Sequence, residues 1–129
     1  MSLRVYSYAK CSTCRNALRW LQERGVAHEV LAIREQPPTR NELTAMLRHV
    51  GGEVRRLFNS SGQEYRALGL AERLPMLSES EAIDLLTANG KLVKRPFAIA
   101  PLGGVVGFKS DEWAKLLDRL NSAPPSDPR

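Results

Sequence analysis

Two cysteines separated by two residues, Cys11 and Cys14, are the side chains of this 129-residue chain whose type and spacing could do chemistry. Such a pair is close enough to form a small disulfide ring, so it could act as a redox couple. Zinc binding is the other common use of the motif, but it needs a second ligand pair. The two histidines, His28 and His49, are widely separated. We therefore expect thiol redox chemistry centred on Cys11, and no metal site.

Cys11 lies where an expected strand passes into an expected helix. Residues 3–8 alternate in character like a strand, whereas apolar residues recur every three or four positions from Ser12 to Arg24. Free amide groups and the helix dipole stabilise a thiolate at such a junction, where thiol pKa values fall from about 8.5 to roughly 3.5–7.5. Lys10 and Arg15 flank the pair and add positive charge. Cys11 is thus the expected nucleophile.

The middle of the chain is expected to be mostly helical. A second strand over residues 28–33 ends before Pro37-Pro38, because proline continues neither a sheet ladder nor a helix. Capping boxes, Thr39 with Glu42 and Ser78 with Glu81, predict the starts of two helices. Shorter helical pieces are expected over residues 53–58 and 63–70.

Two short strands and a helix are expected at the end of the chain. Strands over residues 97–100 and 105–108 should pair antiparallel through the turn 101–104, before a helix that begins at Ser110. The order of elements favours an α/β fold with a mixed four-stranded sheet, parallel in its first half and antiparallel in its second. We expect one domain over residues 1–121 and a disordered tail over 122–129.

Composition narrows the class of protein. Two cysteines are too few for a secreted disulfide scaffold, and no apolar run approaches the roughly 18 residues that cross a membrane, so we expect a cytoplasmic protein without membrane contact. The net charge of +5 is scattered along the chain, which predicts mild attraction to anions but no direct nucleic-acid binding. The tightest basic pair, Arg55-Arg56, fits a solvated helix face as well as a phosphate contact, and we leave it unassigned.

Five segments carry a family resemblance that spans nearly the whole chain. They are YSYAKCSTCRN at 6–16, PPTR at 37–40, Ser61-Gly62 with Tyr65 and Leu68, LVKRP at 92–96, and VGF at 106–108. On these segments the chain resembles the arsenate reductase family of thioredoxin-fold proteins, which includes ArsC, the regulator Spx and the glutathione-linked reductase YffB. The resemblance implies a thioredoxin-like fold with a helical insertion, about residues 37–90, between the second and third strands.

The resemblance also implies roles for individual residues. Cys11 corresponds to the catalytic nucleophile, Arg95 to the arginine beside its sulfur and Pro96 to the cis-proline of the family. Cys14 matches the second cysteine of Spx and would resolve an intermediate as an internal disulfide. The expected catalytic residues are therefore Cys11, Cys14 and Arg95, and the expected substrate-binding residues are Ser12, Thr13, Arg15 and Pro96.

The chain departs from arsenate reductases around the expected oxyanion pocket. Ser7 stands where those enzymes carry a histidine, four residues before the nucleophile. Phe58, and Phe108 or Lys109, stand near the positions of further oxyanion-binding arginines. We expect no bound cofactor, with glutathione and glutaredoxin, or thioredoxin, as the electron donor.

The resemblance leaves different functions open. In the first, the protein is a thiol-dependent oxidoreductase whose Cys11 thiolate attacks an oxyanion or a disulfide, and its partner is a small thiol or a redox protein. In the second, the protein is an Spx-like regulator that binds RNA polymerase and uses a Cys11–Cys14 disulfide as a redox switch. In the third, the protein has the same fold but catalyses no reaction.

Overall fold

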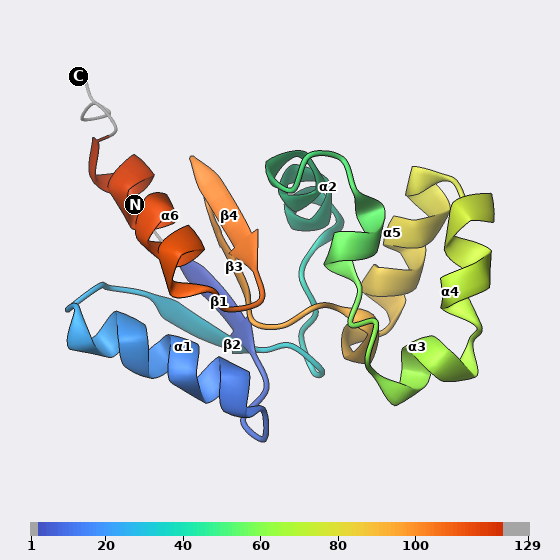
Figure 1. Ribbon diagram of the computed structural model, residues 1–129, viewed down its shortest axis with the longest axis horizontal. Coiled ribbons are helices and arrows are strands. Elements are labelled where there is room, and N and C mark those ends of the chain that lie inside the picture. The colour runs from blue at the N-terminus through green and yellow to red at the C-terminus, as the bar shows by residue number, and fades with distance from the viewer. Residues whose placement is uncertain (1–2, 123–129) are drawn as a thin grey trace.

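Four short strands form a mixed sheet in the order β2-β1-β3-β4 (Figure 1). The structure is a computed structural model and describes residues 3–122. Strand β2 lies parallel to β1, whereas β3 is antiparallel to both β1 and β4. The mixed four-stranded sheet expected from the sequence is confirmed. Its strands are β1 (Arg4–Ser7), β2 (Glu29–Ala32), β3 (Phe97–Ala100) and β4 (Gly103–Val106).

Helices cover both faces of the sheet. Helix α1 (Ser12–Glu23) connects β1 to β2, and α6 (Ser110–Ser122) follows β4; both lie on one face (Figure 1). Alternate strand residues such as Val5 and Ala98 face these helices and pack with the fully buried Trp113 of α6. Residues 123–129 of the expected tail lie outside the described part of the chain. Among residues 3–122 no helix has both the length and the apolar character needed to cross a membrane.

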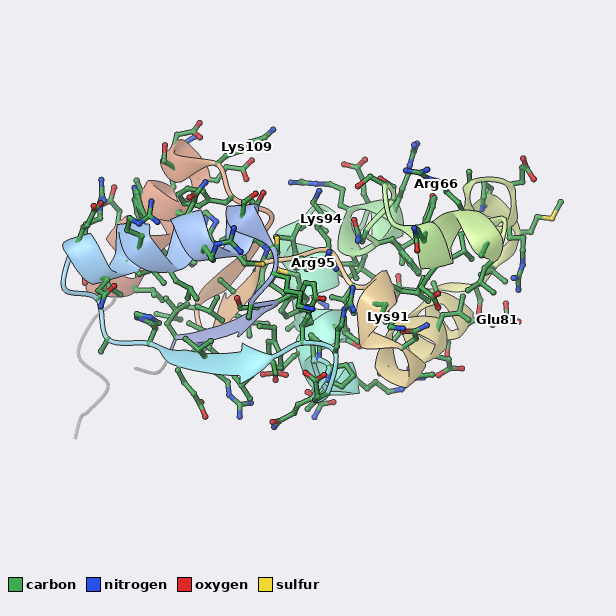
Figure 2. All side chains as sticks on the ribbon, turned by 90° about the horizontal axis from the view of Figure 1, so that it is seen from below. Arg66, Glu81, Lys91, Lys94, Arg95 and Lys109 are labelled. Carbon is green, nitrogen blue, oxygen red and sulfur yellow. The ribbon has the colours of Figure 1, made fainter. Side chains whose placement is uncertain are left out.

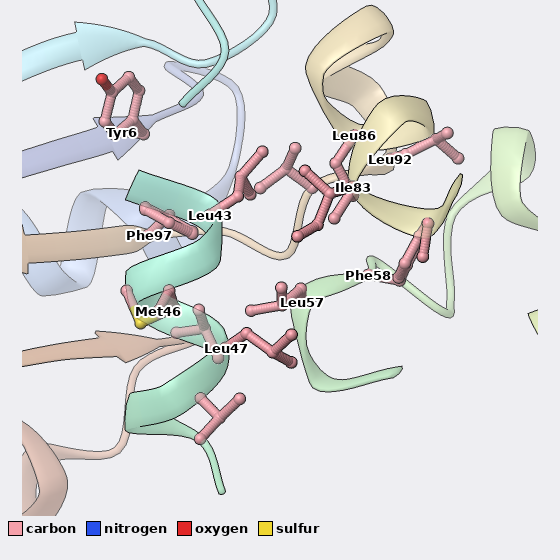
Figure 3. Packing of buried hydrophobic residues seen from close by; sticks show 14 of the residues in the cluster. Tyr6, Leu43, Met46, Leu47, Leu57, Phe58, Ile83, Leu86, Leu92 and Phe97 are labelled. Atoms are coloured by element: carbon pink, nitrogen blue, oxygen red, sulfur yellow. The ribbon is translucent and has the colours of Figure 1, made fainter. Parts of the chain in front are cut away.

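The other face packs against a helical insertion between β2 and β3, as expected. Its core joins Tyr6 and Phe97 of the sheet to Leu43 and Met46 of α2 and to Leu86 of α5 (Figure 3). The insertion consists of the helices α2 (Arg40–His49), α3 (Gln63–Ala67), α4 (Leu70–Arg73) and α5 (Glu79–Ala88), with 3-10 turns η1 (Val54–Leu57), η2 (Leu74–Met76) and η3 (Gly90–Leu92).

Two glycines move element boundaries away from those expected. The single helix predicted over 63–70 is interrupted at Gly69, whose left-handed φ of 63° separates α3 from α4. Gly103 and Gly104, expected in a turn, belong to β4. A Cβ at Gly104 would lie 2.8 Å from Met46 Cε, so glycine serves here to let α2 approach the sheet.

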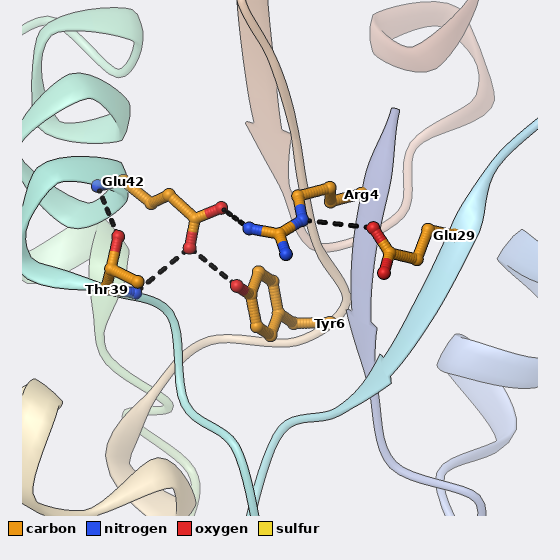
Figure 4. A network of polar contacts seen from close by, with 5 residues as sticks. All are labelled: Arg4, Tyr6, Glu29, Thr39 and Glu42. Carbon is orange, nitrogen blue, oxygen red and sulfur yellow. Dashed lines mark hydrogen bonds and ion pairs between the residues drawn. The ribbon is translucent and has the colours of Figure 1, made fainter. Parts of the chain in front are cut away.

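A polar network fastens the start of α2 to the sheet (Figure 4). One carboxylate oxygen of Glu42 accepts hydrogen bonds from the Tyr6 hydroxyl at 2.6 Å and from the Thr39 amide at 3.0 Å. The other pairs with Arg4 at 3.0 Å, and Arg4 also contacts Glu29 at 3.1 Å. Burial, and then the hydrogen bond to Glu42, raise the pKa of Tyr6 far above its usual value, so this hydroxyl stays a donor.

The Tyr6 hydrogen bond predicts a measurable stability difference. Tyr6→Phe leaves one buried carboxylate oxygen without this donor, and should lower the free energy of unfolding in urea by about 1.5–3 kcal/mol. Tyr65→Phe is the matched control, because the buried Tyr65 hydroxyl has no hydrogen-bond partner within residues 3–122. That control removes a hydroxyl that makes no hydrogen bond, so it should leave the free energy of unfolding unchanged or raise it. Equal losses in the two variants would contradict this account of the network.

Candidate active site

Cys11 occupies the capping position of α1. Its backbone is extended, with φ −99° and ψ 116°, and its amide donates to the Tyr8 carbonyl at 3.0 Å. The Cys11 sulfur accepts a hydrogen bond from the Cys14 amide at 3.4 Å, as a serine or aspartate oxygen does at an ordinary helix start. The first turn of α1 holds no acidic residue. A negative charge on this sulfur therefore meets only favourable dipoles at the helix start.

Cys14 lies one turn further along, with none of its surface exposed. Its sulfur accepts a hydrogen bond from the Tyr8 amide at 3.5 Å, whereas the Cys11 sulfur is partly exposed, and both thiols are free. The start of α1 thus holds one sulfur partly exposed at the capping position and the other buried within the first turn.

The surroundings shift the two thiol pKa values in opposite directions. Partial burial alone would raise the pKa of Cys11, but hydrogen bonds from the side chain and amide of Cys14, together with Arg95, outweigh it and lower this pKa below its usual value. Burial, and then the neighbouring Cys11 charge, raise the pKa of Cys14. The partly exposed Cys11 thiol is therefore the more acidic of the two, and it forms a thiolate more readily than Cys14.

Arg95 is placed by the segment that leads into β3. The Arg95-Pro96 peptide bond is cis. The Pro96 carbonyl accepts a hydrogen bond from the Gly107 amide at 2.8 Å, and the Gly107 carbonyl accepts one from the Trp113 indole at 2.9 Å. Gly107 has a left-handed φ of 71°, which favours glycine at this corner. The end of β4 and helix α6 therefore hold the backbone from which Arg95 reaches the sulfur.

Two guanidinium groups lie over the aromatic ring of Tyr8, near the thiols. The central guanidinium carbon lies 3.9 Å from the Tyr8 ring centroid in Arg34 and 5.0 Å from it in Arg95. Both distances are within the range of cation–π attraction. Tyr8 thus positions Arg95 through its ring while its amide and carbonyl orient the two cysteines.

Cys11 opens into a cavity of about 540 Å³ that also includes Thr13 and Arg95 in its lining. Ser12, Arg15 and Pro96, which were also expected to bind substrate, lie outside that lining. The Arg15 guanidinium instead donates to the Ala9 carbonyl at 2.9 Å. The cavity walls are partly apolar and partly cationic: Phe58, Val106 and Phe108 supply apolar surface, and Arg56, Lys94, Arg95 and Lys109 supply positive charge.

Several of these cavity residues were missed or left open at the level of sequence. Arg56, one of the unassigned basic pair, and Asn59 come from the insertion, far from Cys11 along the chain. Lys94 directly precedes the predicted Arg95, which was the available signal. Ser7 is buried on the Cys14 side, where its hydroxyl hydrogen-bonds to that thiol. Ser7 therefore does not supply the cavity with the positive charge that a protonated histidine would supply from this position.

The insertion is joined directly to the segment that carries Arg95. Phe58 and Val93 form an isolated antiparallel bridge. The Lys94 amide donates to the Leu57 carbonyl at 2.8 Å, and the Asn59 amide donates to the Leu92 carbonyl at 2.7 Å. The two walls of the cavity are therefore linked by backbone hydrogen bonds. Within residues 3–122, no three His, Cys, Asp or Glu side chains are placed to hold a metal ion.

Comparisons with known proteins show which proteins this chain is similar to. The chain is 43% identical over 113 residues to the uncharacterized protein YusI of Bacillus subtilis, a match that covers 88% of this chain and 96% of that protein. It is 34% identical over 124 residues to an arsenate reductase of Rhizobium meliloti, covering 96% and 87% of the two chains.

A solved structure from Bacteroides fragilis, described as an ArsC family related protein, superposes with a TM-score of 0.84. That match has 41% identity and covers 90% of this chain and 98% of the other. The fold is therefore the thioredoxin-like fold that the resemblance implied. The sequence model of the ArsC family matches residues 6–116. The chain therefore belongs to the ArsC family.

Proposed function

We propose that this protein is a thiol-dependent oxidoreductase in which Cys11 attacks a disulfide or an oxyanion and Cys14 resolves the product. The observation that supports it is the position of the Cys11 sulfur, which accepts the Cys14 amide at 3.4 Å at a helix start and opens into a cationic cavity. A lowered pKa and partial exposure are the two properties of a reactive thiol.

With a disulfide substrate, the Cys11 thiolate attacks one of the two substrate sulfurs. A bond forms between that sulfur and Cys11, the substrate sulfur–sulfur bond breaks, and the second substrate sulfur leaves as a thiolate that takes a proton from water. Arg95 and the Cys14 amide hold the negative charge on Cys11 before the attack.

Cys14 then completes the reduction. Its sulfur attacks Cys11, which releases the remaining substrate thiol and leaves a Cys11–Cys14 disulfide in the protein. Cys14 needs no solvent access for this step, because its target is the neighbouring sulfur and not an external molecule. Two electrons from glutathione and glutaredoxin, or from thioredoxin, would return both cysteines to thiols.

The cavity favours a sulfur substrate over an oxyanion. Phe58 and Phe108 line it, and Ser7 stands where arsenate reductases carry a histidine, so fewer groups converge on a small anion. Arsenate remains a candidate, because relatives from Rhizobium meliloti and Escherichia coli are named arsenate reductases.

An activity assay tests the proposed function. Purified protein is supplied with glutathione and glutaredoxin, or with thioredoxin, and NADPH consumption by the matching reductase is followed with small disulfides and with arsenate in turn. We expect turnover with a disulfide that Cys11→Ser abolishes, leaving at most the uncatalysed background. Absence of turnover with every donor, together with recovery of RNA polymerase in a pull-down, would show instead a redox-sensing regulator.

Arg95 should control the pH dependence of Cys11. Because its charge and hydrogen bond favour the thiolate, Arg95→Ala should raise the pKa of Cys11, so that iodoacetamide reacts about 3- to 10-fold more slowly at pH 6 and at an unchanged rate above pH 10. The control is Arg19→Ala, which replaces an exposed arginine on α1, the helix that Cys11 caps. It should leave the pH profile of the iodoacetamide reaction unchanged. Identical profiles for all three proteins would exclude this role of Arg95.

Replacement of Cys14 should separate the attack of Cys11 on a disulfide from the resolution of the mixed disulfide. Cys14→Ser keeps a hydroxyl donor and the backbone amide beside Cys11, so Cys11 should still react with a disulfide, but the mixed disulfide should accumulate. Intact-mass spectrometry of oxidised wild-type protein should show a loss of about 2 Da, which marks the internal disulfide and is absent in the variant. Two alkylatable thiols remaining in oxidised wild-type protein would rule out Cys14 as the resolving residue.

A further inference from the structure

The cavity that contains Cys11 is the middle one of three adjoining cavities. It shares Asn59, Ser61 and Arg95 with a cavity of about 350 Å³ on the side of the insertion. It shares Arg56 and Glu112 with another of about 230 Å³ on the side of α6. The three cavities therefore adjoin one another, with the Cys11 sulfur in the middle one, and we call the three together the groove.

Positive charge follows this groove along its whole length. Arg34 and Lys91 lie in the cavity beside the insertion, Lys94 and Arg95 in the middle, and Lys115 in the cavity beside α6. Figure 2 shows Lys109, Lys94, Arg95 and Lys91 following one another from the start of α6 to the insertion. The acidic residues in the lining are Glu112 and Glu64. Glu64 accepts a hydrogen bond from Asn89.

These cations are available to an external anion. In the part of the chain that the structure describes, the ion pairs within 4.0 Å involve Arg4 and Arg40 and none of the groove cations. Lys91 and Lys115 are exposed at opposite ends. Positive charge that exceeds the negative charge of Glu112 and Glu64 and is not held in ion pairs attracts anions and accelerates their association.

We propose that the substrate of Cys11 is a disulfide carried by an acidic segment of polypeptide, which lies along this groove with its cysteine over the thiol and acidic side chains on both sides. This inference rests on the proposed thiol chemistry and narrows its substrate. The reaction is the exchange described above: Cys11 bonds to the peptide sulfur, the peptide disulfide breaks, and its other half leaves as a thiol.

Two features favour a polypeptide over other anions. A single small thiol fills a cavity of a few hundred Å³, so it would occupy the middle cavity and leave the outer cations at Lys91 and Lys115 unused. A nucleic acid is also a polyanion, but it has no sulfur with which Cys11 could exchange. An acidic segment with a cysteine disulfide satisfies both the charge and the chemistry.

The test compares two blocked peptides. Each has a central cysteine held as its disulfide with β-mercaptoethanol, flanked on both sides by glutamates in one peptide and by glutamines in the other. Single-turnover reduction by the full chain is quenched and measured by mass spectrometry at about 20 mM and about 500 mM salt. The glutamate peptide should react about 10- to 100-fold faster at low salt, and the two rates should converge at high salt.

Variants distant from the thiol locate the effect. Lys91→Gln combined with Lys115→Gln should slow the glutamate peptide about 3- to 10-fold at low salt and leave the glutamine peptide unchanged. The charge-matched control combines Arg19→Gln with Arg73→Gln, two exposed residues outside the groove, and should change neither rate.

Three results would overturn the inference. They are equal rates for the two peptides at low salt, equal slowing by the groove and control variants, and stronger protection of Cys11 from iodoacetamide by a sulfur-free oligonucleotide than by the glutamate peptide. Failure of the proposed chemistry is distinguishable, because neither peptide would then react. Calorimetric binding of the glutamate peptide to Cys11→Ser would still show whether the groove selects acidic segments.

Discussion

The hydrogen bond from the Cys14 amide to the Cys11 sulfur is the interaction on which the site depends. It exists because α1 begins one short loop after the end of β1, so the first amides of the helix have no partner within the helix. The first turn of α1 buries the second sulfur, that of Cys14. One backbone arrangement thus creates both the difference in pKa between the two thiols and their proximity.

The sheet and the insertion supply the two walls of the cavity beside Cys11. Strands β3 and β4, with Trp113 of α6, hold the backbone of Pro96 and Gly107, from which Arg95 reaches the sulfur. The insertion supplies the facing wall through Phe58 and Asn59, and its position is fixed by the buried contacts of α2 with the sheet and by the Tyr6–Glu42 hydrogen bond. The core and the polar network therefore position the cavity although they take no part in chemistry.

Sequence patterns predicted the elements that local signals define. These signals depend on near neighbours in the chain. They gave the capping boxes at Thr39 and Ser78, the strand-to-helix junction at Cys11, and the sequence of strands and helices along the chain. The β4 boundary was misplaced because Gly104 is required by the approach of α2, a contact between distant segments. Arg56 could not be assigned for the same kind of reason, since its place in the lining of the Cys11 cavity follows from tertiary packing alone.

The backbone bridge between Phe58 and Val93 has an evolutionary consequence. It couples the insertion wall to the segment that leads from Arg95 into β3, while the junction of β1 and α1, which holds Cys11, is built separately. Side chains such as Arg56 and Asn59 can therefore vary in the cavity wall while the Cys14 amide keeps its hydrogen bond to the Cys11 sulfur. In such an architecture the lining of the cavity is free to change in sequence, whereas the position of the sulfur is set by the start of one helix.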